Sequence, residues 1–313
     1  MRTPRLGALL GLLLVLLLTA CSASDGESDG GAGTDGGAEL QVAAYNFAEN
    51  QIVANLYAGA LNAAGHPAVV RTLTNREIII PAVQENEMQV VGDFVGTLAE
   101  FLNKQQNGPD APSVASPDLD DTMKNLRELA AQTGLVVLEP AEAKDQNAYA
   151  VRKDFAEEHN LKSLSDLGAY SKDNPVTMGG PPECPQRPFC LPGLEQTYGL
   201  NVSEFVSLDA GGPLTKSALK QGKVDVGMVL TSDGALDQFG LVILKDDKNL
   251  QAVDNIVPVL NQQASTPEID KTLNAVSAKL STEALQELNY KVDWGRENPT
   301  DVASQWLQEN GLA

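Results

Sequence analysis

The feature that most constrains the fold is an alternation of short apolar runs with longer segments of helical periodicity. The first short run, at residues 40–44, is typical of a buried strand. Residues 49–65 then repeat apolar side chains at helical spacing and end at Gly65, which predicts a helix. Continued over three strands, this order predicts a mainly parallel sheet with helices on both faces. The further segments of the pattern are residues 69–73 and 89–91 as strands and residues 76–84 and 97–103 as helices.

A second unit of the same α/β type follows. Residues 147–151 are an apolar run that we interpret as the first crossing between two lobes. Residues 222–249 have the pattern strand, polar turn, strand, which we interpret as the return crossing. The turn holds Thr231, Ser232 and Asp233, and small polar side chains at the end of a strand suit a ligand site. The predicted division is residues 39–146 with 232–313 for lobe 1, including three C-terminal helices, and residues 147–231 for lobe 2.

Residues 1–20 have the layout of an export signal, with a basic start and an apolar run too short for a comfortable membrane span. The sequence Leu-Thr-Ala-Cys at residues 18–21 resembles the bacterial lipobox. This resemblance implies a lipid on Cys21 that holds the protein at the extracytoplasmic face of a bacterial cell membrane. The alternative is an ordinary signal peptide with a coincidental cysteine. Residues 21–38 are rich in Gly, Ser and Asp, which predicts a flexible acidic tether.

Two further cysteines, Cys184 and Cys190, flank a short segment with two prolines that favours a tight turn. Disulfides persist in exported proteins, so we expect the two cysteines to be bonded. Two free thiols or a metal site are the alternatives. A metal site is disfavoured because His66 and His159 are far from both cysteines in the sequence.

Charge and motifs exclude several functional classes. The formal net charge of −20 would repel nucleic acid. The chain has two histidines, which leaves few candidates for a catalytic triad. The sequence shows no phosphate loop, dinucleotide fingerprint or metal-ligand cluster. We therefore expect no enzyme, cofactor or metal, and interpret the chain as a monomeric receptor for a small solute.

Several stretches, in this order and spacing, resemble one known family. The family comprises the substrate-binding lipoproteins of ABC importers for quaternary ammonium osmoprotectants: glycine betaine, proline betaine, carnitine and choline. The similarity runs from about residue 40 to residue 312. The matching stretches are Phe47-Ala-Glu-Asn50, Asn75-Arg76-Glu77 with Pro81-Ala82, Phe94-Val-Gly-Thr97, residues 146–150, residues 198–200, Thr231-Ser-Asp-Gly234 with residues 241–248, and residues 294–312.

The resemblance implies a bilobed periplasmic-binding-protein fold of type II, with two mixed sheets flanked by helices and a two-strand hinge. It implies a partner permease with a cytoplasmic ATPase. It also implies a cage of aromatic side chains around the ligand cation, held by cation–π attraction of roughly 0.5–2 kcal/mol per face. By position, Tyr149 would be a cage residue, Phe94 replaces a family tyrosine and Asp93 replaces a family glutamate.

This chain departs from the family pattern at two places. Val91-Gly92-Asp93-Phe94 stands where the family commonly has Tyr-Pro-Glu-Tyr or Val-Pro-Glu-Tyr. The segment between Cys184 and Cys190 replaces a region that carries Glu-Phe and an Arg in many members, and Arg187 and Phe189 could supply those groups. A different amine, or a larger amphipathic solute, is therefore the alternative ligand, in a sensor or an importer. An exported hydrolase is a further alternative.

The expected ligand-binding side chains come from both predicted lobes. For some of them a structural role is the alternative: Phe47, Phe94 and Tyr149 could be core, Arg187 could be a surface residue, and Asp233 could cap a turn. The expected set is Phe47, Glu49, Asn50, Arg76, Asp93, Phe94, Thr97, Tyr149, Arg187, Thr231, Ser232 and Asp233.

Overall fold

The computed structural model describes residues 39–182, 184–187 and 189–313. The predicted signal peptide, Cys21 and the predicted tether lie outside these residues. No helix in the described part of the chain is both long and apolar enough to span a membrane.

The first sheet is mixed, as the family resemblance implies. It has five strands in the order β2-β1-β3-β10-β4, with β1 parallel to β2 and β3, and β10 antiparallel to β3 and β4. Strand β10 contains Pro258, a residue that argues against a central strand, and no sequence pattern above indicates this strand. Its strands are β1 (Leu40–Tyr45), β2 (Ala68–Leu73), β3 (Val90–Phe94), β4 (Leu135–Val137) and β10 (Ile256–Asn261).

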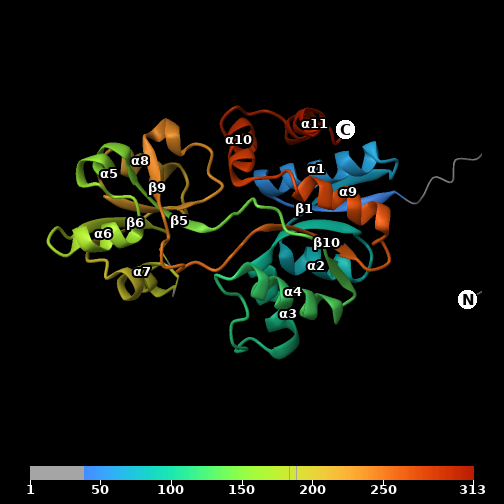
Figure 1. The fold of residues 1–313 in the computed structure, drawn as a ribbon, viewed down its shortest axis with the longest axis horizontal. Coiled ribbons are helices and arrows are strands. Elements are labelled where there is room, and N and C mark those ends of the chain that lie inside the picture. The colour runs from blue at the N-terminus through green and yellow to red at the C-terminus, as the bar shows by residue number, and fades with distance from the viewer. Residues whose placement is uncertain (1–38, 183, 188) are drawn as a thin grey trace, which may run out of the picture. The chain divides into compact units, whose positions relative to one another are not determined.

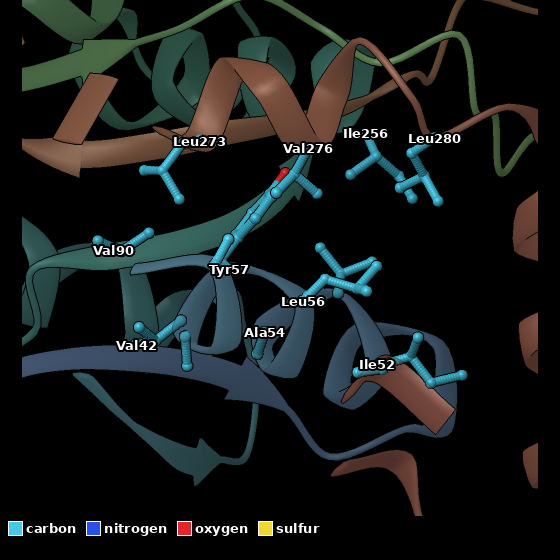
Figure 2. Close-up of a cluster of buried hydrophobic side chains, with 14 of the residues drawn as sticks. Val42, Ile52, Ala54, Leu56, Tyr57, Val90, Ile256, Leu273, Val276 and Leu280 are labelled. Atoms are coloured by element: carbon cyan, nitrogen blue, oxygen red, sulfur yellow. The ribbon is translucent and has the colours of Figure 1, made fainter. Parts of the chain in front are cut away.

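Alternating side chains of this sheet build two hydrophobic cores. Val42 and Ala44 of β1 face one core, which also contains Tyr57 and residues of the C-terminal helices (Figure 2). Ala43 and Tyr45 face the other core. Figure 1 shows the result, with α1 and α9 on one side of β1 and β10 and α2 and α4 on the other. The helices are α1 (Ala48–Ala63), α2 (Arg76–Gln84), α3 (Val95–Asn107), α4 (Leu119–Ala131), α9 (Pro267–Ser277), α10 (Thr282–Asp293) and α11 (Pro299–Glu309).

Side-chain caps explain where several of these helices begin. Asn75 accepts a hydrogen bond from the backbone of Ile78 at the start of α2, and Ser281 caps α10 in the same way. Such caps satisfy backbone N–H groups that have no partner inside the helix. Because α1 and α3 lack a side-chain cap, their first turns directly after β1 and β3 depend on other contacts.

The second sheet is also mixed, with the order β7-β6-β8-β5-β9. Strand β9 pairs antiparallel with β5, so the prediction that all residues from 232 onward belong to lobe 1 is wrong for this strand. The connection from β8 to β9, residues 231–240, contains a 3-10 turn and returns the chain to the second sheet on the far side of β5. The strands are β5 (Asn147–Arg152), β6 (Val176–Gly180), β7 (Val202–Ser207), β8 (Val226–Leu230) and β9 (Leu241–Leu244).

Helices cover both faces of the second sheet as well. One core joins Tyr149 and Met228 to residues of α5, α6 and α7, and the other joins Ala150 and Val229 to α8. The helical segments are α5 (Lys153–His159), α6 (Leu164–Ser171), α7 (Leu191–Tyr198), α8 (Pro213–Lys220) and the short 3-10 turns η1 (Cys184–Gln186) and η2 (Leu236–Phe239).

Candidate functional site

Asp93, an expected ligand-binding residue, is fully buried and surrounded by protein donors. Arg76 Nη2 lies 2.6 Å from Asp93 Oδ1, and the Phe94 backbone N–H donates to the same oxygen at 2.7 Å. The Tyr45 hydroxyl donates to Asp93 Oδ2. Burial, together with the Asp93 charge, raises the pKa of Tyr45, so this phenol stays a donor. The carboxylate therefore braces the ends of β1 and β3, and its acceptor sites are used within the protein.

Asn50 has a similar structural role beside this brace. Its Oδ1 accepts from the Tyr45 backbone N–H at 2.7 Å, and its Nδ2 donates to the Gly92 carbonyl at 2.8 Å. These bonds tie the start of α1 to the ends of β1 and β3. Neither Asn50 nor the Arg76–Asp93 pair lines either of the two cavities described next.

A first cavity, of about 410 Å³, is named here the Glu49 cavity. Its lining comes from the start of α1, the start of α8, the turn after β8 and the end of α10. Its lining residues are Phe47, Ala48, Glu49, Asp145, Ala210, Gly211, Gly212, Lys216, Leu230, Ser232, Asp233, Gly234, Asn289, Tyr290, Asp293 and Trp294.

Hydrogen bonds connect the polar residues of the Glu49 cavity. Asn289 Nδ2 donates to Glu49 Oε2 at 2.6 Å and to the Ser232 carbonyl at 3.0 Å. The Ser232 hydroxyl donates to Asp145 Oδ1 at 2.9 Å. Asp233 accepts from the ammonium group of Lys216. The chain thus fixes each of these side chains through a neighbour from a different segment.

The Glu49 cavity is rich in carboxyl groups. Four of its lining side chains are carboxylates, and Lys216 is the one Lys or Arg among them. Burial, reinforced by the Asp145 charge, raises the pKa of Glu49 to about 8. Burial also raises the pKa of Asp145, and burial with the Asp233 charge raises that of Asp293. Negative charge is therefore costly here unless a cation enters.

A second cavity, of about 660 Å³, is named here the Asp254 cavity. Asp145 is the residue common to both cavities. The side chains bring both signs of charge together with one aromatic ring. The lining residues are Gly96, Thr97, Glu100, Lys104, Pro109, Asp110, Ala111, Ser113, Ala115, Asp145, Gln146, Asn147, Arg187, Phe189, Gln251, Ala252, Val253 and Asp254.

The start of α3 has no cap from its own N-cap residue, and the side chain of Asp254 takes that role. Its Oδ1 accepts from the backbone N–H groups of Gly96 at 2.9 Å and Thr97 at 3.0 Å. Burial raises the pKa of Asp254 to about 7, while the bond from Thr97 opposes that rise. A Cβ on Gly96 would lie 2.3 Å from the Val253 carbonyl oxygen, so only glycine allows the two segments to approach this closely.

The disulfide Cys184–Cys190 is confirmed, and it closes a loop at the Asp254 cavity. Phe189, in this loop, accepts hydrogen bonds at its carbonyl from the Tyr149 hydroxyl at 2.9 Å and from Gln251 Nε2 at 2.8 Å. Tyr149 itself is 1% exposed and packs in the core of the second sheet. Its hydroxyl therefore holds the backbone of the loop at Phe189, and the Phe189 side chain is 47% exposed.

The expected ligand-binding residues thus separate into groups. Phe47, Glu49, Ser232 and Asp233 line the Glu49 cavity. Thr97 and Arg187 line the Asp254 cavity. Tyr149 and Thr231 line a third cavity of about 260 Å³, where the Thr231 hydroxyl donates to the Lys144 carbonyl at 2.9 Å. The other four, Asn50, Arg76, Asp93 and Phe94, form or adjoin the brace between β1 and β3.

The sequence pattern missed several residues that line the two cavities. Asp145 directly precedes a stretch that matches the family, and Trp294 begins the matching C-terminal stretch, so each carried a usable signal. Lys216, Asn289 and Asp254 lie in helices or loops with no motif of their own. In the described part of the chain, no group of three or more His, Cys, Asp or Glu side chains is arranged to hold a metal ion.

Two helix-covered mixed sheets of five strands each form the fold of type II periplasmic binding proteins. The chain belongs to the family described as the substrate-binding domain of ABC-type glycine betaine transport systems, whose model matches residues 38–309. Members of this family are extracytoplasmic binding proteins of transporters rather than enzymes.

Individual relatives agree with this assignment. A glycine-betaine-binding protein of Pseudomonas aeruginosa is 27% identical over 284 residues, which cover 87% of this chain and 88% of the relative. The carnitine transport binding protein OpuCC of Listeria monocytogenes is 29% identical over 171 residues, or 52% of each chain. A crystal structure described as a glycine betaine/carnitine/choline ABC transporter aligns with a TM-score of 0.77 and 22% identity, over 87% of this chain and 99% of that one.

Proposed function

We propose that the protein captures a quaternary ammonium compound of the glycine betaine, carnitine or choline type in the Asp254 cavity and presents it to the permease of an ABC importer. The observation that carries the proposal is the combination of side chains in this cavity. Asp145 and Asp254 supply carboxyl groups that a bound cation would keep ionised, Arg187 and Lys104 supply positive charge, and Phe189 supplies an aromatic side chain.

A betaine requires these features together. Its methylated nitrogen has no N–H to donate, so a protein holds it by charge and by aromatic faces. Its carboxylate is held by Arg or Lys. The names of the Pseudomonas and Listeria relatives, a glycine-betaine-binding protein and a carnitine transport binding protein, support the same ligand class.

A larger amphipathic amine is the second candidate ligand. The cavity volume of about 660 Å³ falls within the range of about 300–1,000 Å³ that is usual for drug-sized ligands. The amine of such a ligand would contact Phe189 and the carboxyl groups, and a polar group elsewhere on the ligand would contact Arg187 and Lys104.

The lipid anchor and the two-lobe division belong to the same proposal. The lipobox-like sequence ending at Cys21 supports a diacylglyceryl anchor at the extracytoplasmic face of the membrane, with residues 21–38 as a tether. A receptor held in this way stays close to its permease, which raises its effective concentration there. Lobe 1 would contain the first sheet, and lobe 2 would contain the second sheet with β9.

Isothermal titration calorimetry of the purified protein tests the ligand assignment. Glycine betaine, choline, carnitine, proline betaine and a long-chain betaine would be titrated in turn. We expect at least one to bind, and we expect Asp254→Asn to weaken its binding about tenfold, because an amide still accepts from Gly96 and Thr97 but carries no charge. The matched variant Asp293→Asn, in the other cavity, should leave the affinity unchanged. No binding of any of these compounds at millimolar concentration would contradict the proposal.

A further inference from the structure

Two buried oxygen atoms of the Glu49 cavity accept no hydrogen bond. They are Glu49 Oε1 and Asn289 Oδ1, both without a partner in the described part of the chain. The side chains are 7% and 6% exposed, and both line the cavity. A buried acceptor without a donor loses the hydrogen bonds it made to water, so most such groups in proteins have a partner. The two oxygens belong to neighbouring side chains that are joined by the hydrogen bond from Asn289 Nδ2 to Glu49 Oε2.

The charge around these oxygens favours a cation. Lys216 is 6% exposed and pairs with Asp233. The ion pairs found among residues 39–182, 184–187 and 189–313 include none with Glu49, Asp145 or Asp293. Glu49, Asp145 and Asp293 therefore line one cavity without an ion pair in that part of the chain, although the nearby Lys216 charge opposes the rise that burial causes in the pKa of Asp293.

We propose that the Glu49 cavity is a second binding site, and that it takes a small organic cation with N–H groups, such as a primary alkylammonium. The N–H groups would donate to Glu49 Oε1 and Asn289 Oδ1, which a quaternary ammonium cannot do. Phe47 and Trp294, 43% and 40% exposed, also line the cavity and offer apolar contact to the alkyl part. The Lys216 ammonium lies 5.8 Å from the centre of the Trp294 ring, which shows that a cation is accommodated beside this ring. A metal ion fits less well, because the described carboxylates are not arranged around a common centre.

The protonation of Glu49 supports this site and gives it a signature. Burial, reinforced by the Asp145 charge, raises the pKa of Glu49 to about 8, which favours the protonated carboxyl group at neutral pH. The charged groups that face it are Asp145 before β5, Asp233 after β8, Lys216 on α8 and Asp293 on α10. A bound cation favours the carboxylate form. Binding should therefore release a proton, and the affinity should rise as the pH increases towards 8.5.

A pair of isomeric cations tests the requirement for N–H groups. tert-Butylammonium and tetramethylammonium have the same atoms and the same charge, but only the first has N–H donors. Each would be titrated calorimetrically into the purified protein in amine-free phosphate buffer at pH 6 and pH 8.5. We expect tert-butylammonium to bind at least about tenfold more tightly than its isomer, and at least about tenfold more tightly at pH 8.5 than at pH 6. Equal affinities, or no binding of either cation, would overturn the proposal.

Variants locate the binding in this cavity. Glu49→Gln should remove the pH dependence and most of the preference for tert-butylammonium, whereas Glu287→Gln, the same change at an exposed site on α10, should alter neither. Asp293→Asn, at a more exposed lining position, should weaken tert-butylammonium severalfold even if Glu49→Gln does not fold. The cation should also change the tryptophan fluorescence, and Trp294→Phe should abolish that change. A preference that survives both carboxyl variants would overturn the site.

The two binding proposals fail separately. Betaine binding that is lost in Asp254→Asn and retained in Glu49→Gln supports the Asp254 cavity alone. tert-Butylammonium binding that persists when no betaine binds supports the Glu49 cavity alone. Competition between a betaine and tert-butylammonium for one site would contradict the assignment of two sites.

Discussion

The two cavities share Asp145 and each contains a buried carboxyl group of raised pKa, yet their chemistry differs. The Asp254 cavity adds Arg187 and Lys104 to its carboxylates, so it can hold both ends of a zwitterion. The Glu49 cavity has one Lys or Arg among its lining residues, Lys216, which pairs with Asp233. The difference shows that a buried acid alone does not select a ligand; the neighbouring charges decide whether a cation or a zwitterion fits.

Hydrogen bonding separates the cavities further. Asp254 Oδ1 already accepts two backbone N–H groups at the start of α3, so its charge can attract a cation that donates nothing. Glu49 uses one oxygen for Asn289 and leaves the other without a donor. The first arrangement suits a methylated nitrogen, and the second requires an N–H group. Six residues expected to bind ligand line neither cavity. Asp93, one of the four that form or adjoin the brace between β1 and β3, provides the largest test of this comparison.

Replacing Asp93 should damage the fold rather than ligand selectivity. Asp93→Ala removes the acceptor for Arg76, for the Tyr45 hydroxyl and for the Phe94 backbone, and leaves a partly buried guanidinium without its partner. We expect a loss of about 3–5 kcal/mol in the free energy of unfolding, measured with urea. The folded fraction should keep the wild-type ranking of betaine and alkylammonium ligands.

A surface ion pair provides the control for this variant. Asp154 pairs with Arg152 at 3.1 Å, but its side chain is 78% exposed. Asp154→Ala should therefore leave the urea midpoint almost unchanged, because solvent screens exposed pairs. A normal unfolding free energy for Asp93→Ala, combined with a lost ligand, would place Asp93 in the binding site and break the division into two cavities.

The fold could be predicted from the sequence because its main signals are local. Strand-length apolar runs and helical periodicity correspond to β1, α1, β3 and β5 within a few residues. Strand β10 and the pairing of β9 could not be predicted in this way. Strand β10 contains Pro258, a residue that argues against a central strand. The pairing of β9 with β5 depends on the tertiary structure.

The site was less predictable, because its residues meet only through tertiary structure. Glu49 and Ser232 match the family pattern, but Asn289, which joins them, lies far along the chain on α10. Asp93 is an expected ligand residue because it stands where the family has a glutamate, and only the positions of Arg76 and Tyr45 show that its oxygens are occupied. Sequence patterns identify polar residues at strand ends without showing which of them are already paired.

The pH dependence of stability should distinguish the two buried acids. Between pH 4.5 and about 8 the folded protein keeps a proton on Glu49 that the unfolded chain loses, so raising the pH through this range destabilises the fold. For Asp254 the corresponding range runs from pH 3.8 to about 7. We expect Glu49→Gln to remove a loss on the order of 3 kcal/mol by pH 8.5, and Asp254→Asn to remove a smaller one.

Urea unfolding at pH 5.5, 7 and 8.5 measures both effects. The stability of Glu49→Gln relative to the wild type should rise across all three pH values, whereas that of Asp254→Asn should stop rising near pH 7. Parallel pH profiles for Glu49→Gln and the wild type would mean that Glu49 is ionised in the folded protein, and the two cavities would then no longer differ in this respect.

The smallest expected effects come from the two exposed phenylalanines, one in each cavity. Phe189→Leu and Phe47→Leu keep an apolar side chain and remove an aromatic face, and the two rings are 47% and 43% exposed. An exposed cation–π contact contributes about 0.5–1 kcal/mol, so each variant should weaken its own ligand about two- to fivefold. Phe189→Leu should weaken glycine betaine and spare tert-butylammonium, and Phe47→Leu should do the reverse. Calorimetry of both ligands on both variants gives four affinities, and each variant serves as the control for the other. If either variant weakens both ligands equally, the rings act on one shared site, and the cavities around Glu49 and Asp254 function as parts of one larger binding surface joined at Asp145.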